Sequence, residues 1–221
     1  MSPRINFEQK LGSLKVHISQ MGKAVEDAFS KLLQAIAVND RQKLEEIQNN
    51  DRTINEMERK IEAECLSLIT RQQPVLASDL RMVSSVLKAV SDLERMGDHA
   101  ADIAEMALRL NGIPYKEYSK TLPYMFEETR MILCDAIELF INGDQEKAKE
   151  FYKRDDVIDN LFNLVKEEMI AGLKEGDKDA DHCVDLLLIA KYLERIGDHA
   201  VNVSEWEVFK ATGNVNEFRI L

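Results

Sequence analysis

Acidic side chains spaced four residues apart recur in this 221-residue chain, and carboxylates in that pattern can bind a cation. In a helix, residues i and i+4 lie on the same face, so each run would form a ridge of like charges. Such pairs destabilise a helix by about 0.2–0.5 kcal/mol each unless a counter-charge offsets them. The candidate ligands are Glu94, Asp98 and Asp102, then Glu194, Asp198 and Asn202, and on the preceding segments Asp51 with Asn55 and Asp155 with Asp159.

Two interpretations of these ridges are open. Hard multivalent cations such as Mg²⁺, Mn²⁺ or ferric iron prefer oxygen ligands and would supply the counter-charge. Alternatively, Arg95 and Arg195 pair with the carboxylates and leave a solvated acidic face. Facing helices could present four carboxylates to one point in the second set, whereas the first set offers three carboxylates and the amide of Asn55. The repetition favours the cation.

Histidine adds little to this candidate site. His99 and His199 each follow an aspartate of a ridge, so a helix turns them about 100° away from it. Metal ligation by these residues is possible, but polar surface or inter-helix hydrogen bonding is the favoured interpretation. The Glu-x-x-His spacing of di-iron bundles is absent from both segments, which argues against oxidase chemistry.

The common sequence motifs of enzymes do not occur in the chain. It contains no GxxxxGK[ST] loop, no GxGxxG, no HExxH and no GxSxG. We therefore expect a non-enzymatic protein.

The three cysteines, Cys65, Cys134 and Cys183, are widely separated and form no CxxC motif. Ordinary thiols in a reducing cytoplasm are therefore favoured over a redox or metal-binding role.

The acidic segments belong to an internal repeat. Residues 94–100 read ERMGDHA and residues 194–200 read ERIGDHA, identical at six of seven positions. The match extends to the preceding segments, where residues 51–55 align with 155–159. A duplicated unit of three helices explains both matches better than coincidence.

Apolar residues recur at spacings of three and four between breaks at proline and glycine, which is the pattern of amphipathic helices. The predicted helices are about 30 residues long, a length that is typical of antiparallel bundles. The fold class predicted is all-α, with two tandem antiparallel three-helix bundles over residues 1–114 and 115–221. Trp206 is expected to pack the end of the second bundle rather than to anchor a partner. The six predicted helices lie near 6–38, 41–71, 76–111, 118–142, 145–173 and 178–211.

Composition narrows the class of protein further. The chain has 40 acidic and 29 basic residues and a net charge of −11, which disfavours direct binding to nucleic acid. Hydrophobic residues make up 45% of it, enough for a core. No run of 18 apolar residues and no apolar signal segment occur, so we expect a soluble cytoplasmic protein.

The paired segments ERMGDHAADIAE and ERIGDHAVNVSE, each closing a three-helix unit, resemble the PhoU family of phosphate-transport regulators. Further matches are RQQP at 71–74, ASDLR at 77–81 and the DxxIN and DxxID segments. The resemblance covers nearly the whole chain and implies two three-helix bundles without enzymatic activity.

The resemblance also implies a role and a cofactor. Members of this family act in the cytoplasm as negative regulators of phosphate-starvation signalling, and several bind metal ions or iron clusters at E/DxxxD motifs. They connect the ATPase subunit of the phosphate ABC transporter to a membrane sensor histidine kinase, so membrane association would be peripheral, through partners. Iron, Mg²⁺, Mn²⁺ or Zn²⁺ would then be held by Asp51 with Asn55, Glu94 with Asp98, Asp155 with Asp159, and Glu194 with Asp198.

Asn55 departs from the motif because it replaces a carboxylate with an amide, so the second site is the better candidate. A metal-binding or metal-storage bundle without a signalling partner is the alternative function. Exposed bundle faces make a homodimer plausible in either case.

Overall fold

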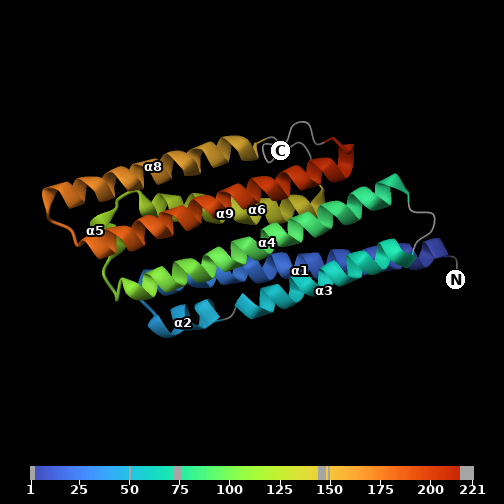
Figure 1. The fold of residues 1–221 in the computed structure, drawn as a ribbon, viewed down its shortest axis with the longest axis horizontal. Helices are drawn as coiled ribbons and strands as arrows, with labels where there is room; N and C mark the ends of the chain where they lie inside the picture. The colour runs from blue at the N-terminus through green and yellow to red at the C-terminus, as the bar shows by residue number, and fades with distance from the viewer. Residues whose placement is uncertain (1–2, 50, 72–75, 144–147, 149, 215–221) are drawn as a thin grey trace.

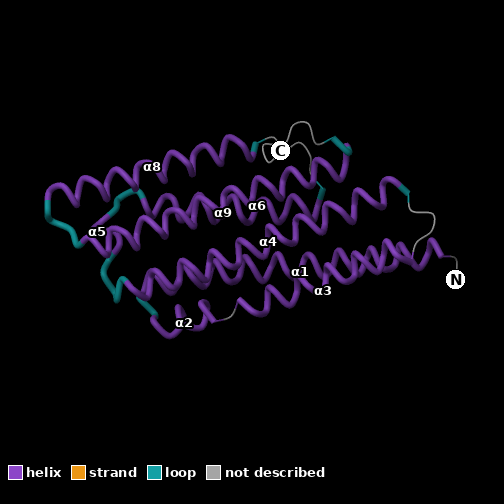
Figure 2. Tube along the Cα trace, viewed as in Figure 1, coloured by secondary structure: helices purple, strands orange, loops and turns teal. Residues whose placement is uncertain are grey.

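A computed structural model of the chain describes residues 3–49, 51–71, 76–143, 148 and 150–214, and the side chains of residues 3–6, 51, 71 and 152 lie outside the description. Within those ranges the chain forms helices and short connections and no strand (Figure 2). None of the described helices is long and apolar enough to cross a membrane. The all-α prediction is confirmed.

The first half comprises α1 (Pro3–Val38), α2 (Arg41–Asn49), α3 (Asp51–Arg71) and α4 (Ala77–Arg109). The second comprises the short α5 (Tyr115–Tyr118), α6 (Leu122–Asn142), α8 (Phe151–Glu175) and α9 (Ala180–Thr212). The helix predicted over 41–71 is thus described as α2 and α3, on either side of residue 50. The helix predicted from 118 begins instead at 122, with a proline in its first turn, and the predicted start near 145 lies outside the described residues.

Residues in left-handed backbone conformations end several helices where the sequence predicted breaks. Gly143 and Gly176 have φ angles of 81° and 73° and cap α6 and α8. Asn39 has φ 52° in the turn after α1. Glycine adopts this region without a steric penalty, and asparagine tolerates it better than most residues. These caps let the chain reverse within a few residues, as an antiparallel bundle requires.

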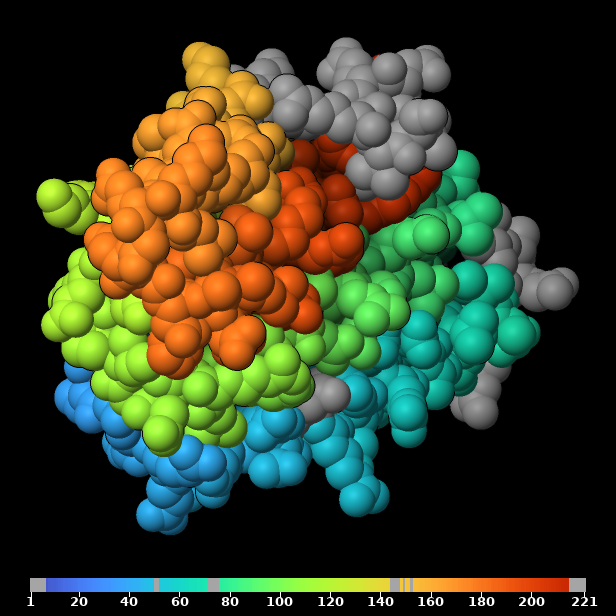
Figure 3. All heavy atoms as spheres, turned by 60° about the vertical axis from the view of Figure 1, so that its left-hand side comes forward, coloured from blue at the N-terminus to red at the C-terminus, as the bar shows by residue number. Residues whose placement is uncertain are grey.

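The two halves pack side by side along α4 and α9 (Figure 1). Helices α1 and α6 also contact each other across the same interface, while α3 and α8 lie at opposite edges of the molecule. Seen from the left-hand end of that view, the halves form one continuous body, with α8 and α9 above and α2 and α3 below (Figure 3). The buried apolar side chains of the described residues form one cluster with members from both bundles.

Glycines permit the closest helix contacts. A Cβ added at Gly22 of α1 would lie 2.5 Å from Ile137 Cγ2 of α6. At Gly97 of α4, an added Cβ would lie 2.8 Å from Ile54 Cδ1 of α3. The equivalent Gly197 of α9 would place it 3.2 Å from Ile158 Cδ1 of α8. A side chain at any of these three positions would force the neighbouring isoleucine to move.

Candidate functional site

The acidic motifs lie at two helix crossings, one in each half. In the first half the outer helix α3 crosses the inner helix α4, and in the second half the outer helix α8 crosses the inner helix α9. In both halves, the isoleucine that packs against the glycine of the GDHA segment sits on the motif-bearing stretch of the outer helix. Ile54 directly precedes Asn55, and Ile158 directly precedes Asp159. The close crossing therefore brings the outer-helix motif beside the inner-helix motif, as the sequence predicted for facing helices.

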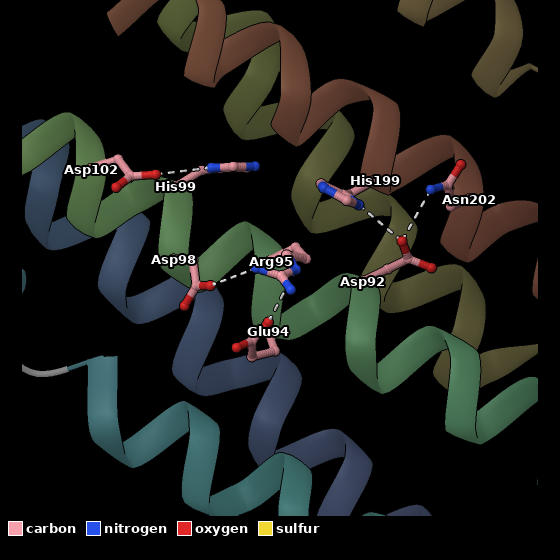
Figure 4. Close-up of polar contacts among 8 residues, drawn as sticks. All are labelled: Asp92, Glu94, Arg95, Asp98, His99, Asp102, His199 and Asn202. Atoms are coloured by element: carbon pink, nitrogen blue, oxygen red, sulfur yellow. Dashed lines mark hydrogen bonds and ion pairs between the residues drawn. The ribbon is translucent and has the colours of Figure 1, made fainter. Parts of the chain in front are cut away.

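In the first half, an arginine neutralises part of the negative charge of the inner-helix motif. Arg95 Nε lies 3.6 Å from Glu94 Oε2, and its Nη1 donates to Asp98 Oδ2 over 3.3 Å (Figure 4). This is the ion pairing that the sequence left open as the alternative to a cation. Asn55 is half-buried on α3, and the side chain of Asp51 lies outside the described part of the chain.

A carboxylate that the sequence reasoning missed joins this first cluster. Burial raises the pKa of Glu58 on α3, and the nearby carboxylates of Glu94 and Glu62 raise it further. Glu58 follows Asn55 by three residues, so helical spacing places both on one side of α3. That spacing was the available signal, and Glu58 with Glu62 is a further acidic pair four residues apart that the candidate ligands did not include.

In the second half, carboxylates from both helices come close together. Asp155 is buried, 6% exposed, and its Oδ1 would lie 3.3 Å from a Cβ added at Gly197. Burial raises the pKa of Asp198, and the charges of Glu194 on α9 and Asp159 on α8 raise it further. Lys191 forms an ion pair with Glu194 and offsets part of this charge. Like charges gathered in this way are what a bound cation would relieve.

The last member of each predicted ridge lies elsewhere. Asp102 Oδ2 lies 3.1 Å from His99 Nδ1, and Asn202 donates from Nδ2 to Asp92 Oδ1 over 3.0 Å (Figure 4). The physical reason is helical drift: each step of four residues turns about 40° beyond a full turn, so two steps turn about 80°. Asp102 and Asn202 therefore face the junction of α4 and α9 and stand apart from the rest of their ridges.

At the junction of α4 and α9, equivalent residues of the two repeat copies make equivalent contacts. His199 Nδ1 lies 2.9 Å from Asp92 Oδ1 across the two helices, as the favoured interpretation of inter-helix hydrogen bonding predicts. The equivalent His99 stacks on Tyr192, with ring centres 5.5 Å apart. Residues 92 and 99 match 192 and 199 at an offset of 100, so the two contacts are counterparts. Burial lowers the pKa of His99.

The remaining residues singled out in the sequence have structural surroundings. Trp206 lies near the end of α9, with its ring edge-on to Phe209 and with Lys88 of α4 6.0 Å from its ring centre. All three cysteines are free thiols, and burial raises the pKa of Cys65 to about 12. Neither feature adds a reactive group to the acidic motifs.

Among the described residues, no group of three or more histidine, cysteine, aspartate or glutamate side chains is arranged to hold a metal ion. The motif residues are neighbours, but their side chains do not form a finished coordination shell. The carboxylates of α8 and α9 are of the right chemistry for a hard cation.

Fold and site together define a duplicated helical-bundle protein with acidic motifs at equivalent positions of its two halves. A sequence profile of the PhoU domain matches the chain twice, at residues 18–107 and 122–206. The chain belongs to the PhoU family. Each matched range contains one copy of the GDHA segment, and the boundary between residues 114 and 115 stays a prediction.

Individual relatives agree with the profile. The "phosphate-specific transport system accessory protein PhoU homolog" of Clostridium acetobutylicum is 34% identical over 207 residues, covering 94% of each chain. "PhoU homolog 1" of Thermotoga maritima is 33% identical over 99% of this chain and 94% of its own. The crystal structure of the "phosphate transport system regulatory protein PhoU" from Streptococcus pneumoniae has a TM-score of 0.87 at 31% identity, covering 96% of this chain and all of its own.

Proposed function

We propose that this protein is an accessory regulator of a phosphate-specific transport system, acting as a cytoplasmic adaptor and not as an enzyme. The observation that carries the proposal is full-length similarity to relatives named for that system, at 34% identity over 94% of both chains. Both halves of the duplicated fold take part in the match. The proposed partners are the transporter's ATPase subunit and a membrane sensor histidine kinase.

The surface of the second half carries many of the exposed large apolar side chains. Large apolar side chains that stay exposed concentrate on α8 and α9, which carry six of the thirteen such residues in the described part of the chain. A contiguous exposed apolar patch would mark a surface used for association, whereas single exposed apolar residues are normal on soluble proteins. These six are Val157, Leu164, Ile170, Leu173, Val184 and Leu188.

Affinity capture tests the adaptor role. The purified chain, immobilised, should retain the phosphate-transporter ATPase subunit and the sensor kinase from the same organism's membranes. In a bacterium lacking its own PhoU-family protein, the chain should also restore repression of a phosphate-starvation reporter at high phosphate. Failure of both assays would leave the alternative, a metal-binding bundle without a signalling partner.

A second proposal concerns metal at the acidic motifs. The carboxylates of Asp155, Asp159, Glu194 and Asp198 would hold a hard cation, with Mg²⁺, Mn²⁺ or iron favoured over Zn²⁺ by the oxygen ligands. The first set of Asp51, Asn55, Glu94 and Asp98 would bind more weakly, because Asn55 is neutral where the second set has the carboxylate of Asp159. The bound ion would offset the repulsion among these carboxylates and hold their side chains in fixed positions.

Elemental analysis tests the metal proposal. The variant with Asp155→Asn, Asp159→Asn, Glu194→Gln and Asp198→Asn should lose metal relative to the wild-type chain after identical purification. The matched control carries Asn55→Asp, which should gain metal at the first set. Equal metal content in all three proteins would contradict the assignment.

A further inference from the structure

Two histidines face each other between the inner helices of the two halves. The rings of His99 on α4 and His199 on α9 have centres 5.6 Å apart and planes inclined by 31°. Their Nε2 atoms are on the sides of the rings that face one another (Figure 4). The two residues are counterparts in the repeat, at an offset of 100 residues.

Each ring has its other nitrogen committed to a carboxylate. His99 Nδ1 lies 3.1 Å from Asp102 Oδ2, and His199 Nδ1 lies 2.9 Å from Asp92 Oδ1. A carboxylate at Nδ1 assigns the proton to that nitrogen in the neutral imidazole and leaves the lone pair on Nε2. Carboxylate–histidine pairs of this kind orient most histidines that ligate metals in proteins.

The Nε2 atom of His99 is also unusual in its surroundings. It is buried and has no hydrogen-bond partner among the described residues. Burying a nitrogen acceptor without a partner costs free energy, and the site of His99 is 11% exposed at the side chain against 19% for His199. A ligand reaching between the rings would satisfy this atom from the more open side.

We propose that His99 and His199 bind one Zn²⁺ ion through their Nε2 atoms, with water or an exogenous anion completing a tetrahedral shell. With Zn–N bonds of about 2.0–2.1 Å, two imidazoles on one tetrahedral ion have ring centres roughly 5 Å apart. The observed separation of 5.6 Å needs a movement of only a few tenths of an ångström per ring. Imidazole ligands select Zn²⁺ and its neighbours over Mg²⁺ or Ca²⁺.

The charges around the rings favour a cation on balance. Asp92 and Asp102 are the two carboxylates bonded to the histidines. The positive charge of Arg195 is close enough to act on His99 and opposes binding, whereas the aromatic ring of Tyr192 stacks on His99 and holds it in place. This ion would link α4 to α9, and so one half of the molecule to the other, at a place apart from the acidic motifs.

Zinc titration of the full chain, after EDTA treatment and removal of the chelator, tests the site. The double variant with His99→Gln and His199→Gln should bind one Zn²⁺ fewer than the wild-type chain. Asp92→Asn should weaken the same site roughly 10- to 100-fold, because it removes the group that orients His199. His17→Gln is the matched control: His17 Nδ1 bonds Glu64 and its Nε2 accepts from Lys60, so neither nitrogen is available, and stoichiometry should not change.

X-ray absorption at the zinc edge separates this site from the acidic motifs. One equivalent of Zn²⁺ should show scattering from two imidazoles, including in the chain with all four second-half motif carboxylates replaced by amides. Circular dichroism should confirm that each variant stays helical, and a misfolded His99→Gln, His199→Gln chain would be replaced by the single His199→Gln variant. Zinc without imidazole scattering, or unchanged stoichiometry in a folded histidine variant, would overturn the proposal, whatever the outcome of the partner assays.

Discussion

At the scale of single residues, the carboxylates crowded between α8 and α9 contribute to the pH dependence of the protein's stability. Burial raises the pKa of Asp198, the charges of Glu194 and Asp159 raise it further, and Lys191 lowers it. A carboxyl group with a raised pKa binds its proton more tightly in the folded than in the unfolded chain. Its contribution to stability is therefore greatest below the ordinary pKa of 3.8 and is lost as pH rises through the raised value.

Replacing Asp198 by asparagine should raise the melting temperature of the metal-free protein at pH 7, because the amide cannot ionise among like charges. The difference between variant and wild type should shrink as pH falls and vanish below the ordinary pKa of aspartate. Thermal melts in chelator-treated buffer across pH 3–8 measure it. Asp177→Asn, at an exposed aspartate in the connection after α8, is the control and should change little. A lower melting temperature for Asp198→Asn at pH 7 would contradict this explanation.

At the scale of elements, the crossing of α3 over α4 depends on a glycine in mid-helix. Glycine inside a helix costs about 1 kcal/mol relative to alanine, so its presence there needs a packing reason. The added Cβ at Gly97 would lie 2.8 Å from Ile54 Cδ1, too close for an unmoved neighbour. By contrast, Gly12 of α1 has nothing within 4 Å of its added Cβ.

Gly97→Leu should therefore destabilise the protein by about 1–3 kcal/mol through overpacking. The same substitution at Gly12 should stabilise it by about 0.5–1 kcal/mol, since only the helix propensity changes there. Urea denaturation of both variants gives the comparison. Adding Ile54→Ala to Gly97→Leu should recover part of the loss, because it removes the atoms that clash. Equal stability for the two leucine variants would show that the crossing is not limited by space.

The elements were largely predictable from the sequence, and the positions of some site residues were not. Apolar spacing and the glycines at 143 and 176 located the helices and their ends because both act locally. The direction of Asp102 depends on accumulated helical rotation and on which neighbour lies beside α4. That neighbour is α9. The apolar face of a helix does not indicate which other helix packs against it. The pairing of His199 with Asp92, 107 residues apart, was beyond reach for the same reason.

At the scale of the whole molecule, the contact of α4 with α9 makes the two halves one body, and this has a consequence for unfolding. The outer helix α3 makes its main contacts with helices of the first half. The single tryptophan, Trp206, lies on α9 in the second half. If the halves unfold as one unit, a substitution that destabilises the core at α3 must also lower the urea midpoint of the unfolding transition reported by Trp206.

Ile61 on α3 provides that test, because its side chain is buried, 1% exposed. Ile61→Ala should cost about 2–5 kcal/mol through lost burial and a cavity. Denaturation followed by Trp206 fluorescence and by far-ultraviolet circular dichroism should then give coincident transitions, both shifted to lower urea by the same amount. Glu56→Ala, on the exposed side of the same helix, should shift neither. A tryptophan transition left at the wild-type midpoint while the circular dichroism splits in two would mean that the halves unfold independently and that the α4–α9 contact is too weak to couple them.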